Sequence, residues 1–286
     1  MKSLVFILIF VSTISTIVAQ TDKERKNEQK DSLFIYEVED RKGPDKVLHA
    51  EPLYIDLIRD LGARKGESEW NIGLGLTDND RFDKYTALVE YEWAPIDRLG
   101  LEVELPFTFY IPNGSIDPNI GSKLNSIKLA TQYSFYVSEE HSTSMALGYI
   151  HEIEMNQFSN YRRSQLFTGN IFNPFFVAAK RFGNNYHTLL YTGPSIGQHF
   201  VDKSLHTVWQ INSNFHYMIT GTRNFLGIEF NKEITSDNFN MVIRPQMRVG
   251  VSENLMIGIV TEIPISNDSQ RLGSFLRLIY EPGGHK

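Results

Sequence analysis

The strongest constraint on this chain is a repeated alternation of apolar and polar residues between about Trp70 and Tyr280. Alternation with a period of two puts apolar side chains on one face of a strand and polar side chains on the other. Most of the expected strands are about 12–15 residues long, enough to cross a bilayer at a tilt. We place them at about 69–77, 83–94, 97–109, 124–138, 142–155, 169–182, 186–200, 206–220, 222–234, 239–250, 253–266 and 270–281.

The pattern predicts an all-β protein, a twelve-stranded antiparallel transmembrane β-barrel. In a bilayer every backbone amide needs a partner, and a closed sheet provides one without long apolar segments. The connections are alternately short and long, which is typical of outer-membrane barrels with short periplasmic turns and longer external loops. An even strand number then places both termini in the periplasm and the long loops 110–123 and 156–168 outside. Ten or fourteen strands, or a soluble β-sandwich with shorter strands, are the alternatives.

The N-terminus has the layout of a secretory signal peptide over residues 1–19. Lys2 supplies a positive charge, Leu4–Val11 is apolar, and a cut is expected between Ala19 and Gln20. The alternative is a transmembrane anchor, but the apolar run is short and a highly charged segment follows it. The sequence therefore predicts export to the outer membrane of a Gram-negative cell, with outer-membrane lipid around the barrel.

Residues 20–67 form a periplasmic N-terminal segment ahead of the barrel, which spans 68–282. We expect a flexible lead over Gln20–Asp31, a short strand within Ser32–Asp40 and an amphipathic helix over 52–61. Apolar residues recur there on one helical face, and Pro52 suits a first helical turn. This helix would plug the barrel or dock a periplasmic protein partner. The candidate plug or docking residues are His49, Glu51, Leu53, Tyr54, Leu57, Ile58 and Leu61.

Charged residues on the strands decide which face is the lumen. A charge at the middle of the bilayer costs several kcal/mol, so these side chains must point inward. The lumen and selectivity candidates are Glu90, Glu92, Glu102, Glu104, Lys128, Glu152, Glu154, Glu229, Glu233, Arg244, Arg248, Glu262 and Arg277. They would either pair with one another, Arg277 with Glu262 for example, or leave a net negative constriction that favours cations. The faces of strands 169–182 and 186–200 cannot be assigned from their pattern.

Several classes of function lack support in the sequence. A net charge of −6 argues against a nucleic-acid partner, and the absence of cysteine excludes thiolate chemistry. His49-Ala50-Glu51 offers two metal ligands without a third, so we expect neither a metal site nor a cofactor. A membrane-embedded hydrolase would need Ser and His together on the lipid face, and Ser195 with His199 is the one such pair that we can draw. Glycosidase chemistry from lumen Glu pairs has still less support.

Two stretches carry a resemblance to known proteins. The run HAEPLYIDLIRDLGARKGE, residues 49–67, followed by Glu69-Trp70-Asn71-Ile72-Gly73, resembles the front end of a family of outer-membrane β-barrel proteins. The hairpin Val89–Pro106 is similar to repeats in larger barrel families that include proposed solute transporters and phenol-degradation-pathway proteins. The resemblance implies the fold and the location, and it transfers no catalytic residue.

The sequence therefore favours a passive channel or transporter for small solutes through a polar, net acidic lumen. The second hypothesis is a structural or accessory barrel whose N-terminal segment plugs the pore or docks a periplasmic partner. A membrane-embedded hydrolase comes third, and we expect that the protein is not an enzyme.

Overall fold

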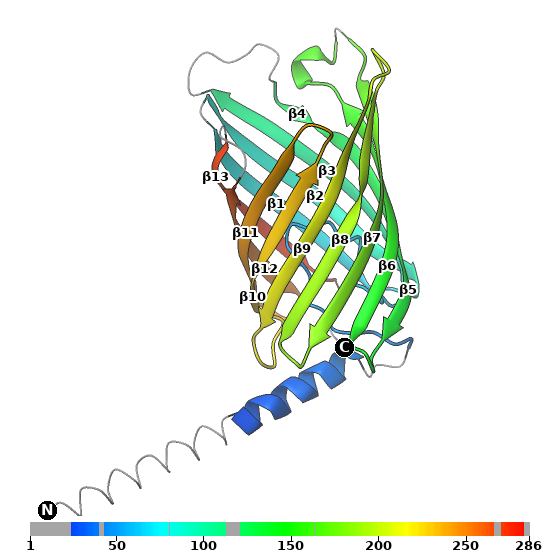
Figure 1. Cartoon of the computed structure of the whole chain (residues 1–286), viewed down its shortest axis with the longest axis vertical. Helices are drawn as coiled ribbons and strands as arrows, with labels where there is room; N and C mark the ends of the chain where they lie inside the picture. The colour runs from blue at the N-terminus through cyan, green and yellow to red at the C-terminus, as the bar shows by residue number, and fades with distance from the viewer. Residues whose placement is uncertain are drawn as a thin grey trace, which may run out of the picture.

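The computed structural model describes residues 24–39, 43–79, 81–112, 121–162, 164–265 and 270–282. The predicted signal peptide, 1–19, lies outside the described residues. The structure is a closed antiparallel barrel, with a helix at 24–39 below it and an irregular segment inside it (Figure 1). No helix in the described ranges has the length and apolar character to cross a membrane.

Twelve strands form the barrel wall, because two of the thirteen labelled strands belong to one crossing. The short β4 (Lys123–Leu124) and β5 (Ser126–Ser138) both pair with β3 and are interrupted at Asn125 alone. The other strands are β1 (Ser68–Asn79), β2 (Phe82–Ile96), β3 (Leu99–Pro112), β6 (Thr143–Met155), β7 (Phe167–Phe182), β8 (Tyr186–His199), β9 (Leu205–Met218), β10 (Phe225–Ile234), β11 (Phe239–Gly250), β12 (Leu255–Pro264) and β13 (Gln270–Tyr280). The predicted fold class is confirmed.

Pairing between the first and last strands closes the barrel. Strands β1 and β13 run antiparallel, with Trp70 opposite Tyr280 and Leu74 opposite Leu276. All other neighbours in the wall are consecutive in sequence. Most of the short turns lie at the end of the barrel where β1 begins and β13 finishes, which we call the terminal end. The two longest connections, from β3 to β4 and from β6 to β7, lie at the opposite, loop end (Figure 1).

The two faces of each strand differ as the alternation predicts. On β1, Trp70, Ile72, Leu74 and Leu76 are exposed on the outer surface, whereas Glu69 and Asn71 are buried on the inner one. The aromatic residues Tyr133, Tyr149, Trp209, Tyr217 and Tyr280 are exposed on the outer surface as well. An apolar outer surface with aromatic residues on it suits a lipid environment.

The helix predicted over 52–61 is wrong. Residues 43–67 contain no helix and no strand, and they lie in the lumen, enclosed by the barrel wall (Figure 1). Their apolar side chains do not share one face: Leu53 packs against Phe225 and Phe275, whereas Ile58 packs in a second cluster with Phe175. The prediction of one apolar helical face fails because two different parts of the wall bury these side chains. The strand expected within Ser32–Asp40 is also wrong, because residues 24–39 form the helix.

Candidate functional site: the plugged lumen

Residues 43–67, which we call the plug, occupy the lumen in the terminal half of the barrel (Figure 1). Inner-wall side chains supply partners for its backbone, which has no regular secondary structure of its own. The Glu229 carboxylate accepts three successive backbone N–H groups, from Leu53 at 3.0 Å, Tyr54 at 3.2 Å and Ile55 at 3.0 Å. Three amides directed at one carboxylate form a compact anion-binding turn. These three hydrogen bonds therefore attach residues 53–55 of the plug to the barrel wall.

Glu229 is itself held by its neighbours on the wall. The Gln246 side chain donates to Glu229 Oε1 at 2.6 Å, and its own oxygen accepts the Leu53 N–H at 3.0 Å. Arg244 lies over the Tyr54 ring, 3.5 Å from the centroid, and pairs with Glu262 at 3.2 Å. Polar wall side chains therefore fix both the backbone and a ring of the plug at this point.

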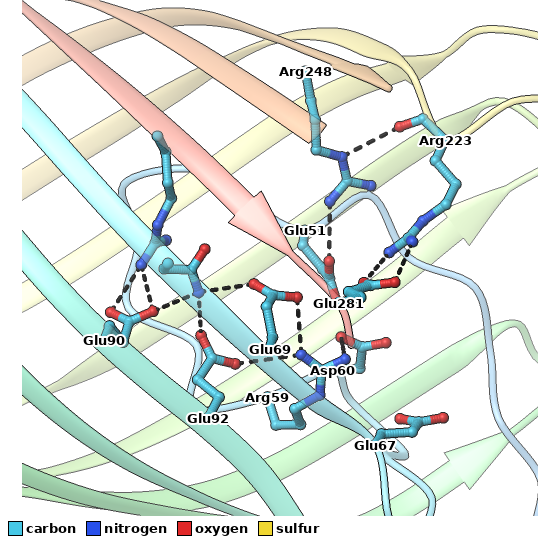
Figure 2. A network of polar contacts seen from close by, with 12 residues as sticks. Glu51, Arg59, Asp60, Glu67, Glu69, Glu90, Glu92, Arg223, Arg248 and Glu281 are labelled. Atoms are coloured by element: carbon cyan, nitrogen blue, oxygen red, sulfur yellow. Dashed lines mark hydrogen bonds and ion pairs between the residues drawn. The ribbon is translucent and has the colours of Figure 1, made fainter. Parts of the chain in front are cut away.

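Arg59 is the centre of a second polar network, drawn in Figure 2. Its guanidinium lies 2.9 Å from Glu69 Oε2 on β1 and 3.6 Å from Glu92 Oε2 on β2. Asn71 donates from Nδ2 to Glu69 at 2.8 Å and to Glu92 at 3.0 Å, which links the two carboxylates. All of these side chains are buried. An arginine from the plug thus compensates carboxylates that the wall alone would leave unpaired.

Lys128 of β5 joins the plug to the wall at a third point. Its ammonium group contacts Asp56 of the plug, lies 3.0 Å from Glu102 Oε1 and donates to Glu104 Oε2 at 2.8 Å. The nearby Glu90 pairs with Arg277 of β13 at 2.7 Å. The expectation from the sequence that Arg277 pairs with Glu262 is therefore wrong, because closure of the barrel places β13 beside β1 and only one strand away from β2.

Residues 49–51 make a fourth set of contacts. His49 Nε2 lies 3.0 Å from Ser144 Oγ. The Ala50 N–H donates to His187 Nδ1 at 3.1 Å, and the Ala50 carbonyl lies 3.3 Å from His216 Nδ1. The Glu51 carboxylate pairs with Arg248 at 3.0 Å (Figure 2). Both predicted polar plug candidates, His49 and Glu51, therefore contact the wall.

Glycines on the wall make room for the plug. A Cβ atom at Gly100 would lie 2.6 Å from the Ile58 carbonyl oxygen, and one at Gly258 would lie 2.5 Å from Leu53 Cδ2. Within the plug, Gly62 has a φ of +84°, which side chains rarely adopt, and its N–H donates to Ser134 Oγ at 2.9 Å. The wall and the plug are therefore complementary in shape as well as in charge.

At the terminal end the plug meets the rim of the barrel. Gly66 donates its backbone N–H to the Ala94 carbonyl at 2.8 Å, and the Arg98 N–H donates to the Ala63 carbonyl at 2.6 Å. Beside them, Arg223 and Glu281 form an ion pair at 2.6 Å (Figure 2). Burial raises the pKa of Glu281, but the two hydrogen bonds from Arg223 outweigh this and hold the pKa below its usual value.

The remaining lumen candidates lie on the same inner face. Glu152 accepts a hydrogen bond from Ser126 at 2.6 Å, and Glu154 lies 3.9 Å from His199. Glu233, near the loop end of β10, is exposed. Of the predicted plug residues, Leu57 packs beside the cluster that contains Ile58 and Leu61. The structure thus brings six lumen candidates into direct contact with the plug: Glu92, Lys128, Glu229, Arg244, Arg248 and Arg277. Among the described residues, no hydrogen bond or ion pair joins Glu152, Glu154 or Glu233 to it.

The sequence placed Gln246 and His216 on inward faces without connecting them to the plug, and it missed the other uncharged and plug-side partners. Arg59, Asp56, Asn71, Gln246, His187 and His216 all contact the plug or the carboxylates around it. One signal was present in the strand pattern: Asn71, Gln246 and His216 occupy inner-face positions that are buried although they are polar. No pattern in the sequence paired them with residues 50–59.

The residues considered for a hydrolase do not form such a site. Ser195 and His199 lie on the inner face of β8, because their parity matches that of the buried His187, Leu189 and Tyr191. On the outer face, His151 Nε2 lies 3.1 Å from Asn170 Oδ1 and its ring stacks on Phe172. Among the hydrogen bonds of the described residues, none joins His151 to a serine.

Known proteins of the same shape are outer-membrane barrels. The COG4313 outer membrane channel from Pseudomonas putida F1 superimposes with a TM-score of 0.62 at 11% identity, over 79% of this chain and 99% of that chain. The KdgM porin gives 0.52 at 11% identity over 74% and 98%, and the NanC porin 0.52 at 7% over 73% and 97%. At these identities the likeness shows the fold alone. No curated protein sequence matches the chain.

The resemblance predicted from residues 49–67 is confirmed at the level of the family. The model of the HAEPLYID-like family matches residues 45–281, which include both the plug and the barrel wall. The match covers most of the chain, and the chain belongs to the HAEPLYID-like family.

Proposed function

We propose that this protein is an outer-membrane channel for small solutes whose lumen is closed by the plug and opens when the plug is released. The observation that carries the proposal is the way in which the plug is held. The wall carboxylate of Glu229 binds the plug backbone, and that of Glu92 pairs with Arg59 of the plug. Water and ions can replace the plug as partners of these polar wall side chains, so the lumen would be polar and permeable to solutes once the plug leaves it.

The charge of the open lumen is part of the proposal. The plug brings Arg59 to Glu69 and Glu92, so its release leaves these carboxylates without that cation. Rings of carboxylates in a pore favour cations. The names of barrels with the same shape support the channel hypothesis, since they describe an outer membrane channel and porins. The orientation follows from the turns: the terminal end and both termini face the periplasm.

A second candidate is an accessory barrel whose plug stays in place and whose helix at 24–39 docks a periplasmic protein. Two large side chains on that helix are exposed, Leu33 by 63% and Tyr36 by 62%. Exposed apolar side chains on a helix are a common means of binding a partner. Asp31 and Glu39 fix the helix to the barrel through Asn185 and Arg181.

The test is single-channel conductance in planar bilayers. We compare the mature chain with the Glu229→Gln variant and with a chain lacking residues 20–67. Glu233→Gln is the matched control, because Glu233 is an exposed inner-face carboxylate and no hydrogen bond or ion pair among the described residues joins it to the plug. Brief openings of the mature chain that lengthen in Glu229→Gln, together with steady cation-selective conductance after truncation, would support the proposal. Silence from every variant, with heat-modifiable gel mobility showing folded barrels, would favour the accessory barrel.

A further inference from the structure

Four carboxylates meet where the plug crosses β2 and β3. Asp56 comes from the plug, Glu90 from β2, and Glu102 and Glu104 from β3. One oxygen of each lies within 4.8 Å of the corresponding oxygens of the other three. Asp56 lies 34 positions before Glu90 and further from Glu102 and Glu104, so no local sequence motif reveals this group of four carboxylates.

The cations in contact with this group do not balance its charge. Lys128 contacts Asp56, Glu102 and Glu104, and Arg277 contacts Glu90. Four negative charges less these two positive charges leave two negative charges among the described residues. Buried charge without compensation is costly, so such a group either binds protons or takes up a cation.

Glu102 gives a second and separate indication. The residue is 2% exposed, and its Oε1 lies 3.0 Å from Lys128 Nζ. Its Oε2 is buried as well and has no hydrogen-bond donor in the described part of the chain. Buried carboxylate oxygens are almost always paired, so a buried oxygen without a donor, on a side chain that belongs to a group of four carboxylates, indicates a missing partner.

We propose that these four carboxylates bind one divalent cation, Ca²⁺ in preference to softer metals, between the plug and the barrel wall. Carboxylate oxygens are the ligands of hard cations, and Ca²⁺ accepts the irregular arrangement that two strands and a loop provide. The cation neutralises the two remaining charges. Because Asp56 belongs to the plug and the other ligands to the wall, the site fastens the plug from the side opposite Glu229. The proposal does not depend on whether the protein conducts solutes.

The experiment is equilibrium dialysis with radioactive Ca²⁺ on the mature chain, refolded in detergent without lipopolysaccharide and stripped with EDTA. We expect one bound Ca²⁺ per chain. Asp56→Asn and Glu102→Gln should each weaken binding by about tenfold or more, because each removes one charged ligand. Lys128→Met should strengthen binding, since it removes a positive charge from the site. Glu233→Gln, which changes a lumen carboxylate outside the group, should leave the affinity unchanged.

Two results would overturn the proposal: no stoichiometric binding by the mature chain, or binding that Asp56→Asn and Glu102→Gln leave intact. Heat-modifiable gel mobility and far-UV circular dichroism show that each variant is folded. If Glu102→Gln fails to fold, Asp56→Asn decides the question alone, because its side chain lies on the plug and not on a strand. Mg²⁺ and Zn²⁺ as competitors test the preference: weaker displacement by Zn²⁺ than by unlabelled Ca²⁺ is expected, and the reverse order would contradict a hard-cation site.

Discussion

Glu229 and Leu53 lie 176 positions apart in the sequence, yet the Glu229 carboxylate accepts the Leu53 backbone N–H at 3.0 Å. The same carboxylate also accepts the N–H groups of Tyr54 and Ile55. We expect Glu229→Gln to loosen the plug, because an amide offers one acceptor oxygen and no charge. The loss should be about 1.5–3 kcal/mol for hydrogen bonds to a charged group. Limited proteolysis of residues 43–67 in the folded protein measures it.

Arg59→Met is expected to destabilise the folded protein strongly. The substitution keeps much of the apolar stem but leaves Glu69 and Glu92 buried without the cation between them. Removing one member of a buried ion pair costs about 3–5 kcal/mol. The midpoint of thermal unfolding in detergent is the measurement. A double variant with Glu92→Gln should recover part of the loss, and no recovery would show that Arg59 does not act through that carboxylate.

Two wall glycines provide a matched pair of substitutions. In Gly100→Ala the new Cβ meets the Ile58 backbone oxygen at 2.6 Å, so the plug itself must shift. In Gly258→Ala the Cβ meets the end of the flexible Leu53 side chain, which can move aside. We expect about 1–3 kcal/mol for Gly100→Ala and less for Gly258→Ala. Protease cleavage within the plug should rank the variants in this order, with Gly250→Ala, where the nearest atom is 3.4 Å away, as the control.

Docking of the plug should weaken in mild acid. Burial, together with the nearby His187 and Arg181, lowers the pKa of His49 to about 3. The pKa in the docked plug is below the value of about 6.5 for a solvated histidine, so the contribution is fully present above pH 6.5 and declines as the pH falls toward 3. Each pH unit in this window costs up to about 1.4 kcal/mol. Protease accessibility of the plug at pH 7.5 and pH 5 tests this, and His49→Gln should reduce the difference between the two.

A charge on the outer surface of β1 should block assembly. Leu74 is 51% exposed and lies near the middle of the strand, opposite Leu276. Arginine on the lipid face near the midplane costs about 2–4 kcal/mol. Leu74→Arg should therefore lower the yield of heat-modifiable barrel in vesicles. Thr77→Arg, on the inner face of the same strand, should assemble normally; equal loss in both variants would mean that the two faces are assigned wrongly.

The strands of the barrel wall were predictable because the alternation of apolar and polar residues that defines them is a local feature of the sequence. The strand expected at 239–250 is β11 (Phe239–Gly250), and the one expected at 142–155 is β6 (Thr143–Met155). Alternation over ten or more residues is visible without knowing what the strand packs against. The alternation is weak in β7 and β8, which is why their faces could not be assigned from the sequence. Their inner faces carry the aromatic residues Phe175 and Tyr191 and not charged ones, because they share a buried cluster with Ile58 and its neighbours in the plug.

The plug was not predictable, because its conformation is decided by groups far away in the sequence. The spacing of Leu53, Ile58 and Leu61 also fits a helix, and nothing local contradicts that reading. In the structure, Glu229 and Gln246, both far away in the sequence, accept the N–H groups of residues 53–55. Ion pairs show the same limit: Arg277 contacts Glu90 only because the barrel closes between β1 and β13.

The plug continues directly into β1, since Glu67 of the plug is followed by Ser68, the first residue of the strand. It is therefore an intramolecular ligand of the lumen, with an effective concentration that its tether sets in the millimolar range. A plug that leaves the lumen cannot diffuse away, and closing the barrel again needs no second molecule. A separate peptide with the sequence of residues 43–67 could match that local concentration only when added at millimolar levels to a chain that lacks the segment.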